Sequence, residues 1–245
     1  MKKILCLFSA LALVLTSCSG DDSSSDSSPD SSTILLKKTI LTDSEGEKTT
    51  VIYKYNGTKI VSELDNYGDG ILYTYTGDLI TKMEFKYDGI IEQTNTYSYT
   101  DGKLTTFVRE DPIMDWGNKE VYTHNSDGSI SVKEYIGDGT TQTQLNSTGT
   151  INFFANGEVS EITSSNNLTY KYVYDTKNNP FKNVLGFGKI AFVDGIADGI
   201  SHNMISETYG TEVTYTATYV YNSNNYPKTV VDNEDGEETK IQCFY

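Results

Sequence analysis

The chain has 245 residues, and its 34 acidic against 19 basic side chains give a formal net charge of −15 at pH 7. Proteins bind nucleic acids and anionic lipid headgroups mainly through lysine and arginine, so a surface this acidic repels both. We therefore expect no nucleic-acid partner. Cations, basic peptides and neutral glycans remain as ligand classes.

The first element in chain order is an export signal. Two lysines precede an apolar run, Ile4 to Val14, and a small-residue cleavage site ends at Cys18. This is the layout of a secretory signal peptide. The run is too short for a transmembrane helix, which needs roughly 20 apolar residues. Because a thiol at the cleavage site can be joined to diacylglycerol, we predict that residues 1–17 are removed and that Cys18 is lipidated.

Residues 18–32 follow as a lipidated tether. This segment offers no apolar side chain after Cys18 that could offset the entropy of ordering, so we expect a disordered linker. Asp21 and Asp22 resemble the acidic export signal of surface-exposed lipoproteins of the Bacteroidetes. The resemblance implies a lipid-anchored protein of the outer membrane that faces the cell surface. The alternative for the acidic pair is a merely soluble linker.

Residues 33–245 form a single repetitive domain in this interpretation. Cys6 leaves with the signal and Cys18 carries the lipid, so Cys243 is alone in the folded part and no intramolecular disulfide can form. One unit recurs, in which an apolar-x-Tyr-x-Tyr strand is followed by a turn, most often containing glycine, and a second alternating strand. Its copies are 51–64, 71–85, 96–108, 121–135, 151–162, 170–184 and 215–230.

Alternation with a period of two is typical of strands with one buried face. We therefore predict an all-β fold, an antiparallel meander of repeated hairpins that forms a curled sheet or a barrel. Asn56-Gly57 favours a two-residue type I′ turn, which would place Tyr53 opposite Ile60. The same register around Thr76-Gly77 would place Tyr73 opposite Ile80.

An irregular insert near 177–206 breaks the repeat, because it is richer in glycine and apolar residues and contains Pro180. Phe181, Phe187 and Phe192 could form a functional lip there, or they could be core residues. We take Trp116, Phe181 and Phe187 as candidate ligand-binding residues.

Catalytic and metal-binding patterns are weak in this sequence. His124 and His202 have no Cys, Asp or Glu at a recurring metal spacing, so we expect neither a metal nor a cofactor. No Gly-x-Ser-x-Gly elbow is present. Glu110, Asp111 and Asp115 lie close to Trp116 in sequence, and paired carboxylates beside an aromatic ring are what glycoside hydrolysis requires.

The segments YKYNGTK, YTYTGDLITK, YSYTDGKL and YVYNSNNYP resemble YD or RHS-type repeats. They are also similar to uncharacterised Bacteroidetes surface lipoproteins built from such units. The resemblance implies an antiparallel β architecture and carries no catalytic residue.

The leading functional hypothesis is a non-enzymatic binding or structural module of the cell envelope, anchored to the membrane by its lipid, with a glycan or an envelope protein as partner. A glycan-active hydrolase and an outer-membrane β-barrel pore are the alternatives. Lys82, Glu84 and Lys86 share one face of the strand expected over 79–87. That charged row does not suit lipid, so we predict that residues 33–245 alone are soluble without detergent.

Overall fold

The computed structural model describes residues 33–166, 169–234 and 236–245. The predicted signal peptide, the lipidation site Cys18 and the tether lie outside the described residues. The described part is all-β, as the alternation predicted, and contains one short 3-10 helix, η1, at Phe187–Lys189.

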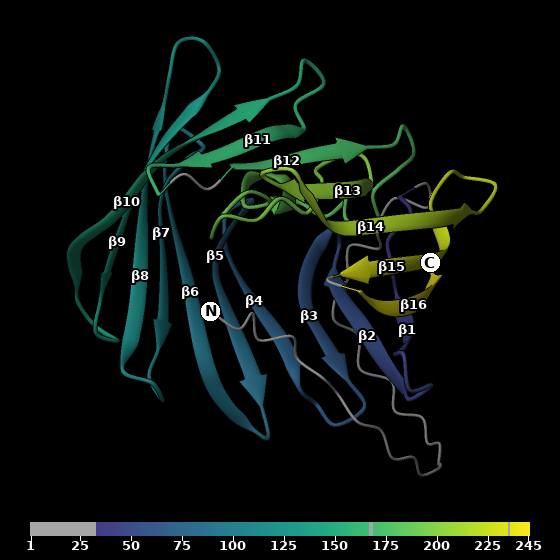
Figure 1. Cartoon of the computed structure of the whole chain (residues 1–245). Coiled ribbons are helices and arrows are strands. Elements are labelled where there is room, and N and C mark those ends of the chain that lie inside the picture. Colours follow the sequence, from purple (N-terminus) through teal and green to yellow (C-terminus); the bar gives the residue numbers. More distant parts are fainter. Residues whose placement is uncertain (1–32, 167–168, 235) are drawn as a thin grey trace.

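Sixteen antiparallel strands close into a barrel in which each strand pairs with its neighbours in sequence and β1 pairs with β16 (Figure 1). The sequence left open a curled sheet or a barrel, and the structure is the closed form. The strands are β1 Lys38–Thr42, β2 Lys48–Asn56, β3 Lys59–Asp65, β4 Gly70–Thr76, β5 Leu79–Tyr87, β6 Ile90–Thr100, β7 Lys103–Asp111, β8 Trp116–His124, β9 Ile130–Gly137, β10 Gln142–Phe153, β11 Val159–Ser164, β12 Thr169–Tyr174, β13 Met204–Tyr209, β14 Glu212–Tyr221, β15 Pro227–Glu234 and β16 Glu237–Phe244.

The hairpin registers differ from the predicted ones. Tyr55, not Tyr53, faces Ile60, and Tyr75, not Tyr73, faces Ile80. The two-residue loop is one position later than predicted, since Asn56 still pairs with Lys59 at the end of the strands. Gly57, with φ of 61°, therefore takes the first loop position, where a type II′ turn requires glycine.

Consecutive antiparallel strands place their connections alternately at the two ends of the barrel. One end carries the turns after β1, β3, β5, β7, β9, β11, β13 and β15, and we call it the acidic end because Asp43, Asp65, Asp88 and Asp115 lie there. The other end carries the remaining turns and the long connection 175–203 between β12 and β13. We call that connection the internal segment and this end the plugged end.

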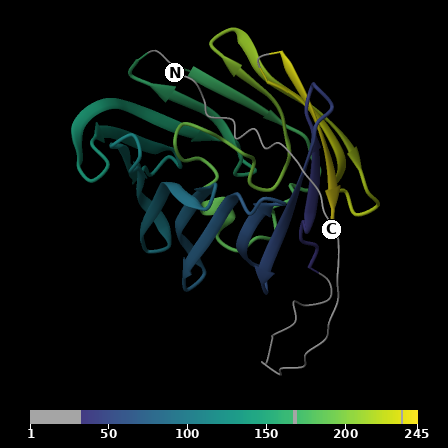
Figure 2. The same ribbon diagram turned by 90° about the horizontal axis from the view of Figure 1, so that it is seen from below.

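The internal segment fills part of the barrel. Val184, Ile190, Phe192 and Ala197 belong to the same buried core as inward-facing strand residues such as Tyr97. Figure 2 shows the segment inside the ring of strands. A barrel of this many strands is wide enough to leave an open lumen unless something occupies it, and here a part of the chain itself does so.

The outward face of the barrel carries polar and charged side chains together with exposed aliphatic ones such as Ile52, Val173 and Val220. Lys54, Thr74 and Lys171 are exposed, and they alternate with inward-facing Tyr53, Tyr73 and other lumen residues. Charged side chains also occupy outward positions well inside several strands, at Lys82, Glu84, Lys119, Lys133, Lys171 and Lys240. Lys82 and Glu84 share one face of β5, as predicted, and that face is the outward one. The two side chains form an ion pair of 2.8 Å there.

Candidate functional site

The internal segment is clamped where it returns to the plugged end by one buried carboxylate. Glu158, in the turn before β11, is fully buried and accepts backbone N–H groups from Ile200 at 2.7 Å, Ser201 at 2.7 Å and His202 at 2.9 Å. Its Oε1 also lies 3.0 Å from Nδ1 of His202. A carboxylate that receives several N–H donors is well stabilised despite burial. The clamp therefore fixes the path of the segment.

A second polar contact holds the part of the segment that reaches furthest along the β7–β8 wall. The Asp194 carboxylate accepts from Arg109 Nη1 at 3.2 Å and from Asn118 Nδ2 at 3.1 Å. Its backbone N–H donates to Glu120 Oε2 at 3.0 Å. Side chains of β7 and β8 thus both hydrogen-bond to Asp194, and these bonds fix the position of the segment in the lumen.

The start of the segment packs against the mouth of the barrel. Phe181 and Phe187 stack with ring centroids 4.7 Å apart, and Tyr53 contacts Phe181 edge-on at 5.8 Å. Gly186 has φ of 79°, and a Cβ there would lie 2.9 Å from the carbonyl oxygen of Asp78. Only glycine fits this close approach to the β4–β5 turn.

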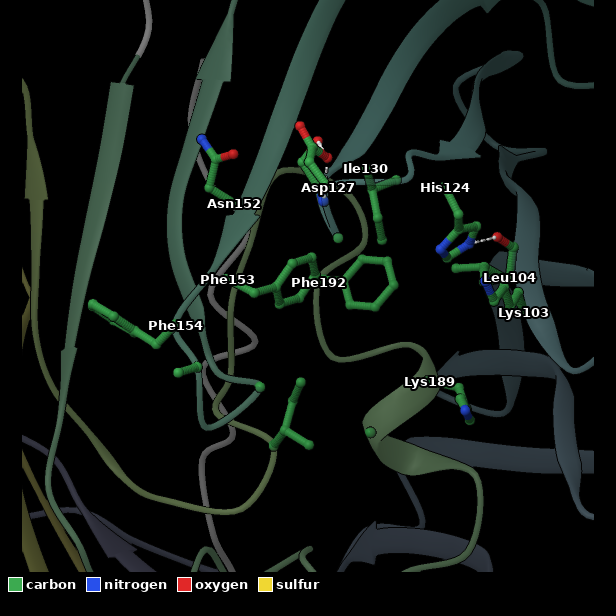
Figure 3. A pocket seen from close by; sticks show the side chains of 16 residues that line it. Lys103, Leu104, His124, Asp127, Ile130, Asn152, Phe153, Phe154, Lys189 and Phe192 are labelled. Atoms are coloured by element: carbon green, nitrogen blue, oxygen red, sulfur yellow. Dashed lines mark hydrogen bonds between the residues drawn. The ribbon is translucent and has the colours of Figure 1, made fainter.

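A cavity of about 680 Å³ opens at the plugged end between the turns of β6 to β11 and the internal segment (Figure 3). We call it the mouth cavity. Phe153, Phe154 and Phe192 supply its aromatic surface. Its polar side chains are Lys103, His124, Asp127, Ser129, Asn152 and Lys189. His124 Nε2 lies 2.8 Å from the carbonyl oxygen of Leu104, which orients the ring.

A smaller pocket of about 150 Å³ lies deeper in the lumen and is lined by Glu120, Glu134 and Asp194. We call it the inner pocket. Phe192 lines both spaces and makes edge-on contacts with Tyr122 and Phe153, each at 5.9 Å. Its ring therefore separates the mouth cavity from the inner pocket.

Burial changes the acidity of two lumen carboxyls. It raises the pKa of Glu120 to about 7, although a hydrogen bond from the Tyr122 hydroxyl acts in the opposite direction. It also raises the pKa of Glu63 to about 7 against a similar bond of 2.9 Å from Tyr73. Near neutral pH the lumen can thus take up protons at both positions.

The structure separates the three predicted ligand-binding residues. Phe181 and Phe187 lie together at the plugged end and are partly buried in the core. Trp116 is 38% exposed at the acidic end, where Arg109 lies 5.4 Å from its ring. Of the aromatic residues of the mouth cavity, the predicted lip contained only Phe192. Phe153 and Phe154 are the other two. Their adjacency in sequence, just before a turn that contains glycine, was the feature from which they could have been predicted.

The three carboxylates near Trp116 have separate environments. Asp111 is buried and its Oδ1 accepts the N–H groups of Ile113 and Met114, whereas Asp115 accepts the N–H of Gly139 in the neighbouring turn. Glu110 lies between the inward positions Arg109 and Asp111 and so points outward. Asp111 and Asp115 thus stabilise turns, and Glu110 lies on the outward face, away from both.

Among the residues that the structure describes, no group of three or more His, Cys, Asp or Glu side chains is placed to hold a metal ion. Within the same residues, no helix has the length and apolarity needed to cross a membrane.

Comparison with solved structures finds porin-like proteins of the same fold. The crystal structure of a porin-like protein from Bacteroides vulgatus matches with a TM-score of 0.56 and 14% identity, over 87% of this chain and 99% of that one. One from Bacteroides uniformis matches with a TM-score of 0.51 and 12% identity, over 85% and 96%. No family model matches the chain, and no curated protein matches it either. At these identities the likeness is one of fold, so the chain is a 16-strand barrel that resembles Bacteroides porin-like proteins.

Proposed function

We propose that this porin-like barrel is an outer-membrane lipoprotein that faces water and binds a glycan at its mouth cavity, without catalysing a reaction. The observation that carries the proposal is that charged side chains occupy outward positions well inside several strands, around a lumen that the chain itself partly fills. The lipid on Cys18 supplies the attachment to the membrane, and the fold likeness to porin-like proteins of Bacteroides agrees with an outer-membrane address.

The outward charges weigh against burial in lipid. A lysine on the lipid face of a barrel costs about 2–4 kcal/mol at the bilayer midplane. Outward charges occur well inside several strands, and the Lys171 side chain is 60% exposed. Lys171 pairs with Glu161 at 3.7 Å, an arrangement typical of a water-facing sheet. A barrel that is held at the membrane by a lipid tether keeps these charges in water. A barrel that spans the membrane would have to place them in lipid.

The mouth cavity has the composition of a sugar site. Phe154 is 46% exposed although it lies beside a cavity, and Phe153 and Phe192 extend the aromatic surface inward. Sugars place their C–H faces on aromatic rings and their hydroxyls on polar groups. Asp127 and Asn152 provide such groups at the same cavity.

Solubility tests the first half of the proposal. Residues 33–245 expressed without signal and tether should be soluble without detergent and give a β-type circular dichroism spectrum. In the full chain, Cys18→Ala should abolish lipid labelling and release the protein from membranes. Recovery of the truncated chain only in detergent, with a heat-modifiable band on gels, would overturn the water-facing barrel.

Glycan binding tests the second half. On a glycan array, Phe154→Ala should weaken binding at least tenfold, because the exposed ring is the platform. Trp116→Ala, at the opposite end, is the matched control and should bind like the parent chain. An array with no bound glycan, or an equal loss in both variants, counts against the mouth cavity as the site.

An outer-membrane pore is the second candidate, favoured by the 16-strand closure and by the likeness to porin-like proteins. In that case the internal segment would act as a plug that must move before anything passes. Planar-bilayer recordings decide between the two. Steady conductance that increases when Phe192 is replaced by alanine supports a pore, and silence at every protein concentration supports the binding module.

A further inference from the structure

The mouth cavity has the opposite charge to the chain as a whole. Acidic side chains outnumber basic ones by 34 to 19 in the sequence. Among the described residues that line the mouth cavity, by contrast, the charged ones are Lys103, Lys189 and one carboxylate, Asp127. Two lysines and one aspartate give a formal charge of +1, with His124 taken as neutral. The cavity is therefore a basic site in an acidic protein.

The protein does not neutralise either lysine of the mouth cavity. Within the described part of the chain, neither Lys103 nor Lys189 forms an ion pair with a carboxylate. Lys59, at the same end of the barrel, differs from them because it pairs with Asp78 at 3.4 Å. Lys103 and Lys189 are both exposed. Their ammonium groups can therefore bind an anionic group of a ligand without first breaking an ion pair.

The other two titratable side chains of the cavity are held by neighbouring groups. Nε2 of His124 donates to the carbonyl oxygen of Leu104 at 2.8 Å, which keeps the ring beside the residue that follows Lys103. Oδ1 of Asp127 accepts the N–H of Ser129 at 2.9 Å and its hydroxyl at 2.7 Å. Asp127 thus stabilises its own turn, and the two lysines remain as the charged groups for a ligand.

Basic and aromatic side chains line different parts of the mouth cavity. In the view of Figure 3, Lys103, His124 and Lys189 lie on the right, whereas Phe154 lies on the left and Phe192 lies between them. The volume of about 680 Å³ falls within the range of about 300–1,000 Å³ that is typical of small-molecule sites. A sugar chain that packs on the phenylalanine rings can therefore present a charged substituent to the lysines.

We propose that the glycan bound at the mouth cavity is acidic, with its carboxylate or sulfate group held by Lys103 and Lys189. This inference rests on the proposed glycan site and names its class of ligand. The charge of the whole chain favours neutral glycans, because it repels anions at a distance. Salt limits that repulsion to a range of about 8 Å at physiological ionic strength, whereas the lysines act on a bound sugar at contact.

The test compares acidic sugars with uncharged forms of the same sugars. The full mature lipoprotein, in a non-ionic detergent, is applied to an array that carries oligogalacturonates, their methyl esters, heparin oligosaccharides and their desulfated forms. The parent chain should bind the acidic member of at least one pair tenfold more tightly than its counterpart. The pair that shows this preference identifies the anionic group as a carboxylate or a sulfate.

Two double variants separate this inference from the glycan site itself. Lys103→Gln/Lys189→Gln should abolish the preference for acidic sugars and leave the binding of the uncharged forms unchanged, which also shows that the variant is folded. Lys59→Gln/Lys182→Gln removes the same charge from the plugged end outside the cavity and should keep the preference. Equal binding of acidic and uncharged sugars by the parent chain would overturn the acidic ligand and leave the glycan site standing. So would an unchanged preference in Lys103→Gln/Lys189→Gln, whereas an array with no bound sugar would overturn both proposals.

Discussion

The two ends of the barrel are built from the same kind of hairpin, yet their acidic residues do different work. At the acidic end, Asp43 and Asp65 each accept two backbone N–H groups from within their own turn. At the plugged end, Glu158 accepts three from the internal segment, more than 40 residues further along the chain. Asp43 and Asp65 thus shape single turns at one end, whereas Glu158 positions a whole segment at the other.

This difference separates local from long-range stability. An aspartate that caps its own turn affects a few neighbouring residues, and its loss leaves the barrel wall in place. The groups that hold the internal segment join its path to the mouth cavity and to the inner pocket. Substitutions at the plugged end should therefore change both stability and access to the lumen.

The largest effect is expected for Phe192→Ala. Phe192 is 7% exposed and separates the mouth cavity from the inner pocket, so its loss removes buried apolar area and joins the two spaces. We expect a destabilisation of about 3–5 kcal/mol, measured by urea unfolding. Phe244→Ala, on the outward face and 40% exposed, should cost less than about 1 kcal/mol. Similar losses for the two would show that Phe192 is not a packed partition.

Glu158→Gln should come next. The amide keeps the shape of the side chain but weakens the three charge-assisted bonds of the clamp, and its NH₂ group adds a buried donor. We expect a loss of about 2–4 kcal/mol and faster hydrogen exchange at Ile200, Ser201 and His202. Glu45→Gln in an exposed turn of the acidic end is the control. Unchanged exchange in the segment would contradict the clamp.

The third prediction is a pH dependence that originates in the lumen. The folded-state pKa of Glu63 and of Glu120 is about 7, above the value of 4.5 expected when unfolded. The folded chain therefore binds more protons between these values, so stability rises as pH falls from about 8 to about 5. We expect a gain of up to roughly 2–3 kcal/mol for each of the two carboxyls, measured as a rise in Tm. Glu120→Gln should flatten the profile, and a Tm that falls over this range in the parent chain would refute the assignment.

The features that could be predicted from the sequence are those that depend on residues close together in the chain, such as individual strands and the face that each side chain occupies. The strand expected over 79–87 coincides with β5, and the placement of Lys82 and Glu84 on one face is the outward row of the barrel. Closure was not predictable, because the pairing of Thr39 with Cys243 joins strands far apart in sequence. The mouth cavity was missed for the same reason. Phe153 and Phe192 meet only when the internal segment enters the lumen.

The smallest effect is expected at the acidic end, with Asp65→Ala. Oδ1 of Asp65 accepts the N–H groups of Tyr67 at 2.8 Å and Asp69 at 2.9 Å, so the alanine variant loses two bonds in a single turn. We expect a destabilisation of about 1–2 kcal/mol, with faster hydrogen exchange confined to the β3–β4 turn. Asp65→Asn keeps an oxygen acceptor at the same place and should retain most of the stability. If Asp65→Ala instead loosened the internal segment, the two ends would be coupled, and the distinction between local and long-range carboxylates would fail.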